Sequence, residues 1–390
     1  MNNNKYIIKK LSPWMMDELL AFSEITTFDV IFLREQDVFY KDTIQQLKSK
    51  NVNVYIKPYS LNRSIKKLFV SLQFLFSNLF SFGFDYNGVI GLKSIVWFLR
   101  LDMSLFSENS KIHTQFATQA ALISLLIKKY FNGKPEHSFT FHAHDIYFNN
   151  KWFKLMVDQS HKSFSISEYN INYINKNYLQ SDKVKLARLG VFRDLTDKIE
   201  KEDNSEVLSL GLISRLVEKK GISYLLQALL DIKKMKKYKV KLTIAGNGPL
   251  TDEILEFVKE NNLTDIVRYI GIIKGVQKQE FFNNLDVFIL PSITLKNDMD
   301  GIPVVLMEAV AASLPIISTN VSGIPEICHD DYNGLLIEEK NVEAIIKAID
   351  FMAENESKRK FYAKNSLLLS KEYDIVLNSK SKISELGWNS

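Results

Sequence analysis

Near-continuous apolar segments separated by helical stretches recur through the second half of the chain. They cover residues 206–213, 239–246, 266–271, 287–292, 315–319 and 334–337. Apolar runs of this length suit strands that are buried on both faces, and the helical stretches supply the connections between parallel strands. The pattern therefore predicts an α/β fold whose second half is a doubly wound parallel sheet.

The first half shows the same alternation less regularly. Residues 29–33 and 51–56 are strand-like, and residues 41–50 between them are helical in pattern. With 390 residues the chain is long enough for two domains. Residues 193–205 are polar and charged without apolar periodicity, which is typical of a linker. We expect one Rossmann-like domain over residues 1–198 and a second over residues 199–371.

Composition narrows the functional classes. A hydrophobic fraction of 46% and a charged fraction of 24% are typical of a globular protein. The single cysteine, Cys328, excludes an internal disulfide, and we expect a packed thiol there. A net charge of +5, without aromatic–basic repeats, does not favour nucleic acid as a partner. The first ten residues are not followed by a long apolar core, so no signal peptide is predicted, which favours a cytoplasmic location.

One apolar segment, residues 68–84, contains no charged residue. Lys66 and Lys67 precede it, and Lys93 and Arg100 follow it. Its seventeen residues include five polar ones, so it is too short and too polar to span a bilayer of roughly 30 Å. We favour a buried helix of the first domain. The alternative is a helix that lies in a membrane surface beside its basic flanks and gives the protein a peripheral membrane contact.

A loop that ends in a proline-led helix lies between residues 298 and 326. Pro303 suits the first helical position, and the pattern predicts a helix over residues 304–312. The start of that helix offers unpaired N–H groups to an anion, at Gly301, Ile302, Val304 and Val305. Asp300 and Glu308 bracket this site eight residues apart, and we expect them to bind sugar hydroxyls. A local ion pair of Glu308 and a helix cap at Asp300 are the alternative.

Two earlier turns also carry candidate ligands. Arg215 and Lys220 follow the first strand of the second half, and both could bind a diphosphate. Gly246 and Gly248 follow the next strand and would let a ligand approach the backbone closely. A nicotinamide-binding fingerprint would need a third glycine where Thr251 stands, so that cofactor class is not favoured.

Two histidines, His142 and His144, lie in the segment 138–149, where an apolar strand is expected to end. His142 and His144 should point to the same side, with Asp145 opposite or in the turn. The carboxyl ends of strands are where open α/β sheets bind ligands, so His142 is a candidate site residue. Further metal ligands are not evident nearby, and we expect no zinc site.

These segments resemble the retaining family 4 glycosyltransferases with the GT-B fold. Residues 300–309, DGIPVVLMEA, are similar to the family motif Glu-Gly-x-Pro-x-x-x-x-Glu-Ala, with Asp300 where glutamate is usual. Residues 211–221 are similar to its Gly-Arg-Leu and Lys-Gly motif, with Ser214 where glycine is usual. Thr140-Phe141-His142 is similar to its Thr-x-His, and residues 246–249 to its Gly-x-Gly-Pro turn.

The resemblance implies two Rossmann-like domains that face each other across a cleft. It implies strands at residues 165–170 and 184–191 before the linker, and a C-terminal helix, residues 372–390, that returns to the first domain. The implied activity is transfer of a sugar from a nucleoside diphosphate donor, expected to be UDP-linked, with retention of configuration. The acceptor would be a saccharide or a lipid-linked saccharide in the synthesis of a cell-surface polysaccharide such as a capsule or O-antigen.

The resemblance also implies roles for the candidate residues. Arg215, Lys220 and the helix start at residues 301–304 would bind the diphosphate, and Gly246 and Gly248 would lie near the nucleotide. Glu308 would bind ribose, Asp300 the sugar hydroxyls, and His142 would lie near the reacting carbon. Residues 298–300 spell the Asp-x-Asp of metal-dependent transferases of another fold, but their late position argues against that role. We expect no metal cofactor.

Other functions stay open from the sequence. A sugar-nucleotide epimerase or a phosphorylase of the same fold would use similar phosphate ligands. A non-catalytic scaffold could bind nucleotide without transferring sugar. The sugar, the base and the acceptor are not specified by these motifs.

Overall fold

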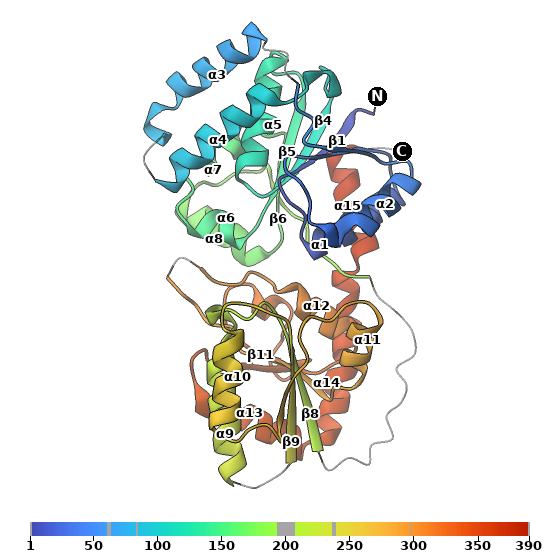
Figure 1. Ribbon diagram of the computed structural model, residues 1–390, viewed down its shortest axis with the longest axis vertical. Coiled ribbons are helices and arrows are strands. Elements are labelled where there is room, and N and C mark those ends of the chain that lie inside the picture. Colours follow the sequence, from blue (N-terminus) through green and yellow to red (C-terminus); the bar gives the residue numbers. More distant parts are fainter. Residues whose placement is uncertain are drawn as a thin grey trace. The chain divides into compact units, whose positions relative to one another are not determined.

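A computed structural model describes residues 2–60, 64–82, 85–192, 207–235, 239–296 and 298–388. It divides the chain into two compact units (Figure 1). Unit 1 comprises Met1–Gly190 with Ile375–Ser390, and unit 2 comprises Val191–Asp374. The predicted linker, residues 193–205, lies outside the described residues.

In the described part of unit 1, seven parallel strands form one sheet in the order β3-β2-β1-β4-β5-β6-β7. Their bounds are β1 Asn4–Ile8, β2 Asp29–Phe32, β3 Asn53–Ile56, β4 Lys111–Gln115, β5 Glu136–Phe141, β6 Lys162–Ser165 and β7 Val184–Leu186. The strand order reverses between β1 and β4. Open α/β sheets bind ligands beyond the carboxyl ends of the strands at such a reversal.

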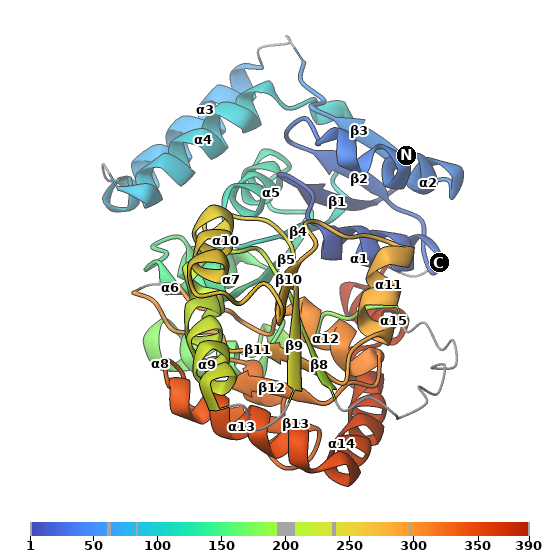
Figure 2. The same cartoon turned by 60° about the horizontal axis from the view of Figure 1, so that its bottom comes forward.

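Helices cover both faces of this sheet (Figures 1 and 2). The central one is α5, whose first nine residues are all buried. The helices of unit 1 are α1 Pro13–Ser23, α2 Lys41–Ser49, α3 Ile65–Ser77, α4 Tyr86–Arg100, α5 Gln119–Tyr130, α6 Ala143–Tyr147, α7 Phe153–Gln159, α8 Glu168–Asn177 and α15 Ile375–Leu386. Short 3-10 helices are η1 Val38–Tyr40, η2 Leu79–Ser81 and η3 Met103–Leu105.

The segment after unit 2 completes the core of unit 1. Lys382 of α15 donates a hydrogen bond to Glu18 of α1 at 2.5 Å, and both side chains are buried. Trp388 is 1% exposed and stacks on Phe28 with 6.0 Å between ring centroids. The Thr26 hydroxyl donates to the Trp388 carbonyl at 3.2 Å. Residues far apart in sequence therefore share one hydrophobic core.

In the described part of unit 2, six parallel strands lie in the order β10-β9-β8-β11-β12-β13. They are β8 Val207–Ile213, β9 Lys239–Ala245, β10 Val267–Tyr269, β11 Val287–Leu290, β12 Ile316–Thr319 and β13 Gly334–Ile337. This is the strand order of a Rossmann domain, with its reversal between β8 and β11. The prediction of two Rossmann-like, doubly wound α/β domains is confirmed.

The helices of unit 2 pack against this sheet. They are α9 Ile222–Met235, α10 Thr251–Glu260, α11 Val276–Asn283, α12 Val304–Ala311, α13 Val342–Glu354 and α14 Glu356–Leu369. The 3-10 helices are η4 Glu218–Lys220, η5 Ile324–Glu326 and η6 Ser370–Tyr373. Cys328 is buried, as predicted, and burial raises the pKa of its thiol.

The prediction of a buried helix over residues 68–84 is wrong. The structure has α3 followed by η2, with residues 83 and 84 outside the described part, and α3 leaves one face open. Phe69 and Phe76 are each 66% exposed, whereas Lys67 and Ser71 point inward. Within the described residues, no helix combines the length and apolar character that crossing a bilayer requires.

Other predicted boundaries also differ. The expected strand over residues 184–191 ends at Leu186. The expected strand over residues 165–170 ends at Ser165, because the Ser167 side chain accepts a hydrogen bond from the Asn170 N–H and caps α8. The expected helix over residues 372–386 begins as η6, and α15 starts only at Ile375.

Candidate functional site

The candidate site of unit 2 lies where the strand order reverses. The loops that follow β8 and β11 meet there, and they bring Lys220 and Asp300 together. The Lys220 Nζ lies 2.7 Å from Asp300 Oδ2, and the Ser292 hydroxyl donates to the same oxygen at 2.8 Å. Asp300 is only 8% exposed. Residues eighty positions apart thus form one buried ion pair at the ligand-binding edge of the sheet.

The charges around Asp300 are balanced. Burial alone would raise the pKa of Asp300, but the charges of Lys220 and Lys219, with hydrogen bonds from Lys220 and Ser292, outweigh burial and lower it. Lys219 Nζ also lies 2.9 Å from Asp298 Oδ1. Asp300 is therefore an ionised carboxylate held by cations.

The two acids of the Asp-x-Asp sequence are thus each paired with a lysine. Among the residues that the structure describes, no group of three or more His, Cys, Asp and Glu side chains could hold a metal ion.

Close backbone packing fixes the loop that carries Lys220. Gly221 has φ +64°, and a Cβ there would lie 1.9 Å from the carbonyl oxygen of Pro291. The Ile293 N–H donates to the Lys219 carbonyl at 2.8 Å. Only glycine fits such an approach, so the sequence at Gly221 locks the loop after β8 against the loop after β11.

The loop after β9 packs just as closely on the loop after β8. Gly246 has φ +120°, and a Cβ there would lie 1.8 Å from the Ser214 carbonyl oxygen. A Cβ at Gly248 would lie 2.2 Å from the Leu216 carbonyl oxygen. Arg215 stands between these two contacts with its side chain exposed. The predicted diphosphate ligand Arg215 and the two predicted glycines therefore belong to the same edge as Lys220.

The helix start differs by one position from the prediction. Pro303 is the N-cap of α12 rather than its first residue, because its ψ of 126° is extended. Its carbonyl accepts from the Leu306 N–H at 2.9 Å. Among the described residues, none accepts a hydrogen bond from the N–H groups that the sequence singled out, those of Gly301, Ile302, Val304 and Val305.

Glu308 lies in the second turn of α12 and forms an ion pair with Lys278 of α11. Burial raises the pKa of Glu308, and the charge and hydrogen bond of Lys278 oppose this shift in part. The local ion pair that the sequence left as an alternative is thus present. A contact of Glu308 with ribose stays a prediction.

His142 belongs to unit 1 and caps α6. Its carbonyl accepts from the Asp145 N–H at 2.9 Å, its own N–H donates to Asp145 Oδ2 at 2.9 Å, and its Nε2 lies 2.9 Å from Gln115 Oε1. Burial, followed by the charge of Lys382, lowers the pKa of His142 to about 3, so the ring is neutral. His144 is exposed while His142 is buried, which corrects the expected same-side pair. The reason is that β5 ends at Phe141 and the chain turns into a helix.

The sequence missed the residues that hold these groups. Gln115 Nε2 donates to Glu18 at 2.6 Å and to the Tyr6 hydroxyl at 2.7 Å, so a polar network lies behind His142. Gln115 and Ser292 each stand at or beyond the carboxyl end of a strand, a position that could have identified both. Lys278 lies on another helix, and spacing along the chain gives no sign of its contact with Glu308.

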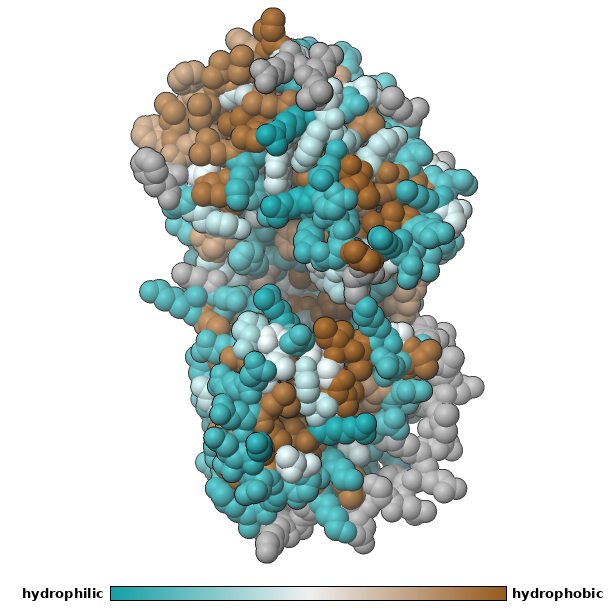
Figure 3. All heavy atoms as spheres, in the orientation of Figure 1, coloured by the Kyte–Doolittle hydropathy of each residue, from teal (hydrophilic) through white to brown (hydrophobic). Residues whose placement is uncertain are grey.

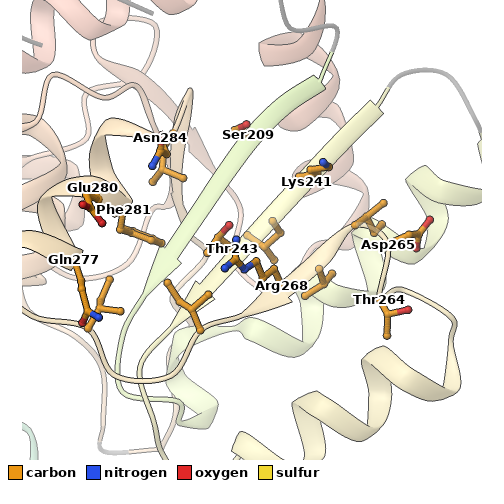
Figure 4. Close-up of a pocket in the computed structure, with 16 residues that line it drawn as sticks. Ser209, Lys241, Thr243, Thr264, Asp265, Arg268, Gln277, Glu280, Phe281 and Asn284 are labelled. Carbon is orange, nitrogen blue, oxygen red and sulfur yellow. The ribbon is translucent and has the colours of Figure 1, made fainter. Parts of the chain in front are cut away.

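A cavity of about 740 Å³ lies elsewhere in unit 2, between α11 and the face of β9 and β10. Figure 4 shows Lys241 and Thr243 of β9 on one side and Gln277, Glu280 and Asn284 of α11 on the other. The residues that line it include no predicted site residue. It exists because α11, with eight residues, covers only part of the sheet face.

Comparison with known proteins finds similarity to glycosyl transferases. Residues 194–367 match the family described as Glycosyl transferases group 1. The chain is 29% identical over 178 residues to the amylovoran biosynthesis glycosyltransferase AmsK of Erwinia amylovora, covering 45% of this chain and 44% of that protein.

It is also 32% identical over 175 residues to a Campylobacter jejuni protein, covering 44% of this chain and 43% of that protein. That relative is named N-acetylgalactosamine-N,N'-diacetylbacillosaminyl-diphospho-undecaprenol 4-alpha-N-acetylgalactosaminyltransferase. The chain spans about two fifths of the length of these curated relatives.

The fold extends over the whole chain. The crystal structure of Anabaena Alr3699/HepE in complex with UDP and glucose is similar with a TM-score of 0.71 and 13% identity, covering 99% of this chain and 100% of that one. Solved glycosyltransferase structures share these two parallel-sheet domains. The fold of this chain is thus the predicted GT-B class, and its residues 194–367 resemble the glycosyl transferases of group 1.

Proposed function

We propose that the protein is a retaining glycosyltransferase that uses a nucleoside diphosphate sugar in the synthesis of a cell-surface polysaccharide. The observation that carries this proposal is the Lys220–Asp300 ion pair at the strand reversal of unit 2, within the region that matches the glycosyl transferases of group 1. A largely buried lysine, Lys220, beside the exposed Arg215 can bind a diphosphate, and the buried carboxylate of Asp300 can accept hydrogen bonds from sugar hydroxyls.

In the mechanism we propose, negative charge grows on the diphosphate as the glycosidic bond breaks. Lys220, Arg215 and the N–H groups at the start of α12 stabilise that charge. The acceptor attacks from the face that the diphosphate leaves, and the departing phosphate takes the acceptor's proton. Lys220 shares its charge between Asp300 and the diphosphate, so no metal ion is required.

Two contacts in this mechanism remain separate predictions. Glu308 binds the ribose hydroxyls after exchanging part of its contact with Lys278. His142 lies near the reacting carbon as a neutral ring, because its pKa of about 3 leaves it unprotonated. Its Nε2 already has Gln115 as a partner, so we propose that it acts by position and not as a general base.

The substrates are inferred from the relatives. The HepE structure contains UDP, which supports a UDP-linked donor, and the Campylobacter jejuni name includes a diphospho-undecaprenol, which supports a lipid-linked acceptor. AmsK is named for amylovoran biosynthesis, which supports a polysaccharide product. A cytoplasmic protein at the inner face of the cell membrane would meet both substrates.

Screening nucleotide sugars for donor hydrolysis and transfer tests the proposal. The wild type should consume one UDP-sugar, and Lys220→Ala should lower that rate by roughly 10- to 100-fold, as expected for a charged hydrogen bond of about 1.5–3 kcal/mol. Lys241→Ala, in the separate cavity, is the matched control and should keep the wild-type rate. Equal rates for Lys220→Ala and the wild type would refute the assignment of the site.

A further inference from the structure

The hairpin formed by α3 and α4 buries polar as well as apolar side chains. α3 buries Lys67, which donates to the carbonyls of Leu101 at 2.6 Å and Leu99 at 3.3 Å, and it also buries Ser71 beside Phe74. α4 buries the polar residues Asn87 and Ser94 beside Phe98. Helices at a protein surface normally turn such polar residues outward. Here part of the inner face is polar, while many apolar side chains face outward.

The outer face of the hairpin is apolar. On α3 and the following η2 it consists of Ile65, Leu68, Phe69, Leu72, Phe76, Leu79 and Phe80, and on α4 of Tyr86, Val89, Leu92 and Val96. The exposed positions of α3 recur at helical spacing, so they form one stripe. Figure 3 shows brown, hydrophobic residues gathered where Figure 1 places α3 and α4. Contiguous apolar surface of this kind marks an interaction site.

Cations border this face. Lys93 and Arg100 are exposed on α4, at helical spacing from Val89 and Val96. Arg34, which follows β2, lies with its Cζ 5.8 Å from the centroid of the Trp97 ring, one turn after Lys93.

A further cation lies at the same edge of unit 1. Lys9, after β1, has its pKa lowered first by burial and then by the charges of Arg34 and Lys93, so these three cations lie near one another. The one acid among the described residues of the hairpin, Asp85, is paired with Lys151 at 2.8 Å. The border of the apolar face is therefore positive.

We propose that the α3–α4 hairpin is a docking surface for an anionic phospholipid bilayer. The apolar stripe would enter the boundary between head groups and acyl chains, and Lys93, Arg100 and Arg34 would contact lipid phosphates. The choice of a bilayer rests on the proposed function, in which the acceptor is carried by a lipid. A second copy of this chain fits less well, because a symmetric pair would bring the same cations together.

Vesicle sedimentation tests this surface. The purified full chain should bind vesicles of phosphatidylglycerol and phosphatidylcholine and bind pure phosphatidylcholine more weakly. Phe69→Ser/Phe76→Ser should lower binding at least tenfold, while Leu255→Ser/Leu377→Ser, which removes exposed apolar side chains on α10 and α15, should not. Lys93→Gln/Arg100→Gln should lower binding to the anionic vesicles alone, by roughly fivefold for each cation.

Several results would overturn the proposal. One is that the wild-type protein stays in the supernatant. Another is that the Phe69→Ser/Phe76→Ser variant still binds vesicles. A third is that the wild type is a dimer by sedimentation equilibrium and this variant is a monomer. Circular dichroism melting shows that each variant is folded. Donor hydrolysis measured without vesicles separates the two proposals, because a protein that binds vesicles and consumes no nucleotide sugar would refute the enzyme and leave the docking surface standing.

Discussion

At the scale of single residues, Lys220 and Asp300 depend on each other. Each is largely buried, and removing one partner would leave the other with an uncompensated charge. The pair therefore serves both the fold of the loops and the proposed binding of the donor. Substitutions at the two positions should affect stability as well as activity, and the two effects must be measured separately.

Asp300→Asn tests the carboxylate. We expect kcat/KM for donor consumption to fall roughly 10- to 100-fold, because a charged acceptor of sugar hydroxyls becomes a neutral one. Asp298→Asn is the matched control, since Asp298 is 44% exposed and, among the described residues, its ion pair is with Lys219. The change in kcat/KM caused by this control should correspond to a free energy within about 1 kcal/mol, the usual limit for an exposed ion pair. Equal losses in the two variants would contradict the role of Asp300.

The raised pKa of the Asp145 carboxyl predicts that the stability of the fold depends on pH. Burial raises the pKa of this carboxyl to about 7, although hydrogen bonds from the backbone N–H groups of His142 and Ala117 oppose the shift. Because this pKa lies above the unfolded value of about 3.9, its contribution to stability is complete below about pH 4 and is lost as the pH rises through 7. Asp145→Asn cannot titrate.

Calorimetry at pH 6 and pH 8 measures this effect. The melting temperature of the wild type should fall between these two values by more than that of Asp145→Asn. Other groups titrate in the same range, but they do so equally in both proteins and cancel in the difference. An identical fall in the two proteins would show that Asp145 is already ionised at pH 6.

At the residue level, the sequence singled out charged residues by type, but it could not show the contacts that join distant segments. Lys220 and Asp300 were singled out separately, and the structure joins them. Ser292 was part of a predicted strand, but nothing in the sequence indicated its hydrogen bond to Asp300. The ion pair between Lys278 and Glu308 joins two helices whose packing depends on the tertiary fold.

At the scale of elements, glycine contacts between loops hold the candidate site together. Gly221→Ala should destabilise unit 2 by more than the roughly 1–2 kcal/mol cost of a left-handed backbone, because its Cβ would also meet the Pro291 carbonyl. Gly271→Ala is the matched control, with φ +70° and open space around the Cβ position. Chemical denaturation should separate the two variants, and equal costs would contradict the close approach.

The strands of unit 2 were predicted correctly, whereas the burial of α3 was not. The strands of unit 2 are mostly apolar and alternate with helical stretches, and all six were predicted. The α3 segment is apolar around most of its circumference, and periodicity does not say which side faces the protein. Lys67 decides the matter through buried carbonyl contacts that are visible only in the fold.

At the scale of the whole molecule, unit 1 is closed by residues that follow unit 2. Trp388→Ala removes a large side chain from the core around Phe28, and we expect unit 1 to lose about 3–5 kcal/mol. Leu377→Ala on α15, the helix that precedes Trp388, is the control, because its side chain is 55% exposed. Calorimetry should show a lower transition for unit 1 and an unchanged one for unit 2. A shift of both transitions would mean that the two units unfold together.

Two domains were predictable because each half repeats the strand and helix alternation on its own. The contribution of Lys382 and Trp388 to the core of unit 1 was not contained in that alternation, since it depends on which unit the last helix packs against.

The position of α15 also sets an order of events during synthesis. All of unit 2 leaves the ribosome before Lys382 and Trp388 do, so unit 2 can fold while the nascent chain is still growing. Glu18, Phe22 and Phe28 meanwhile lack the partners that bury them. The nascent protein thus carries an unfinished N-terminal half through most of translation, and this half is where chaperones would be needed.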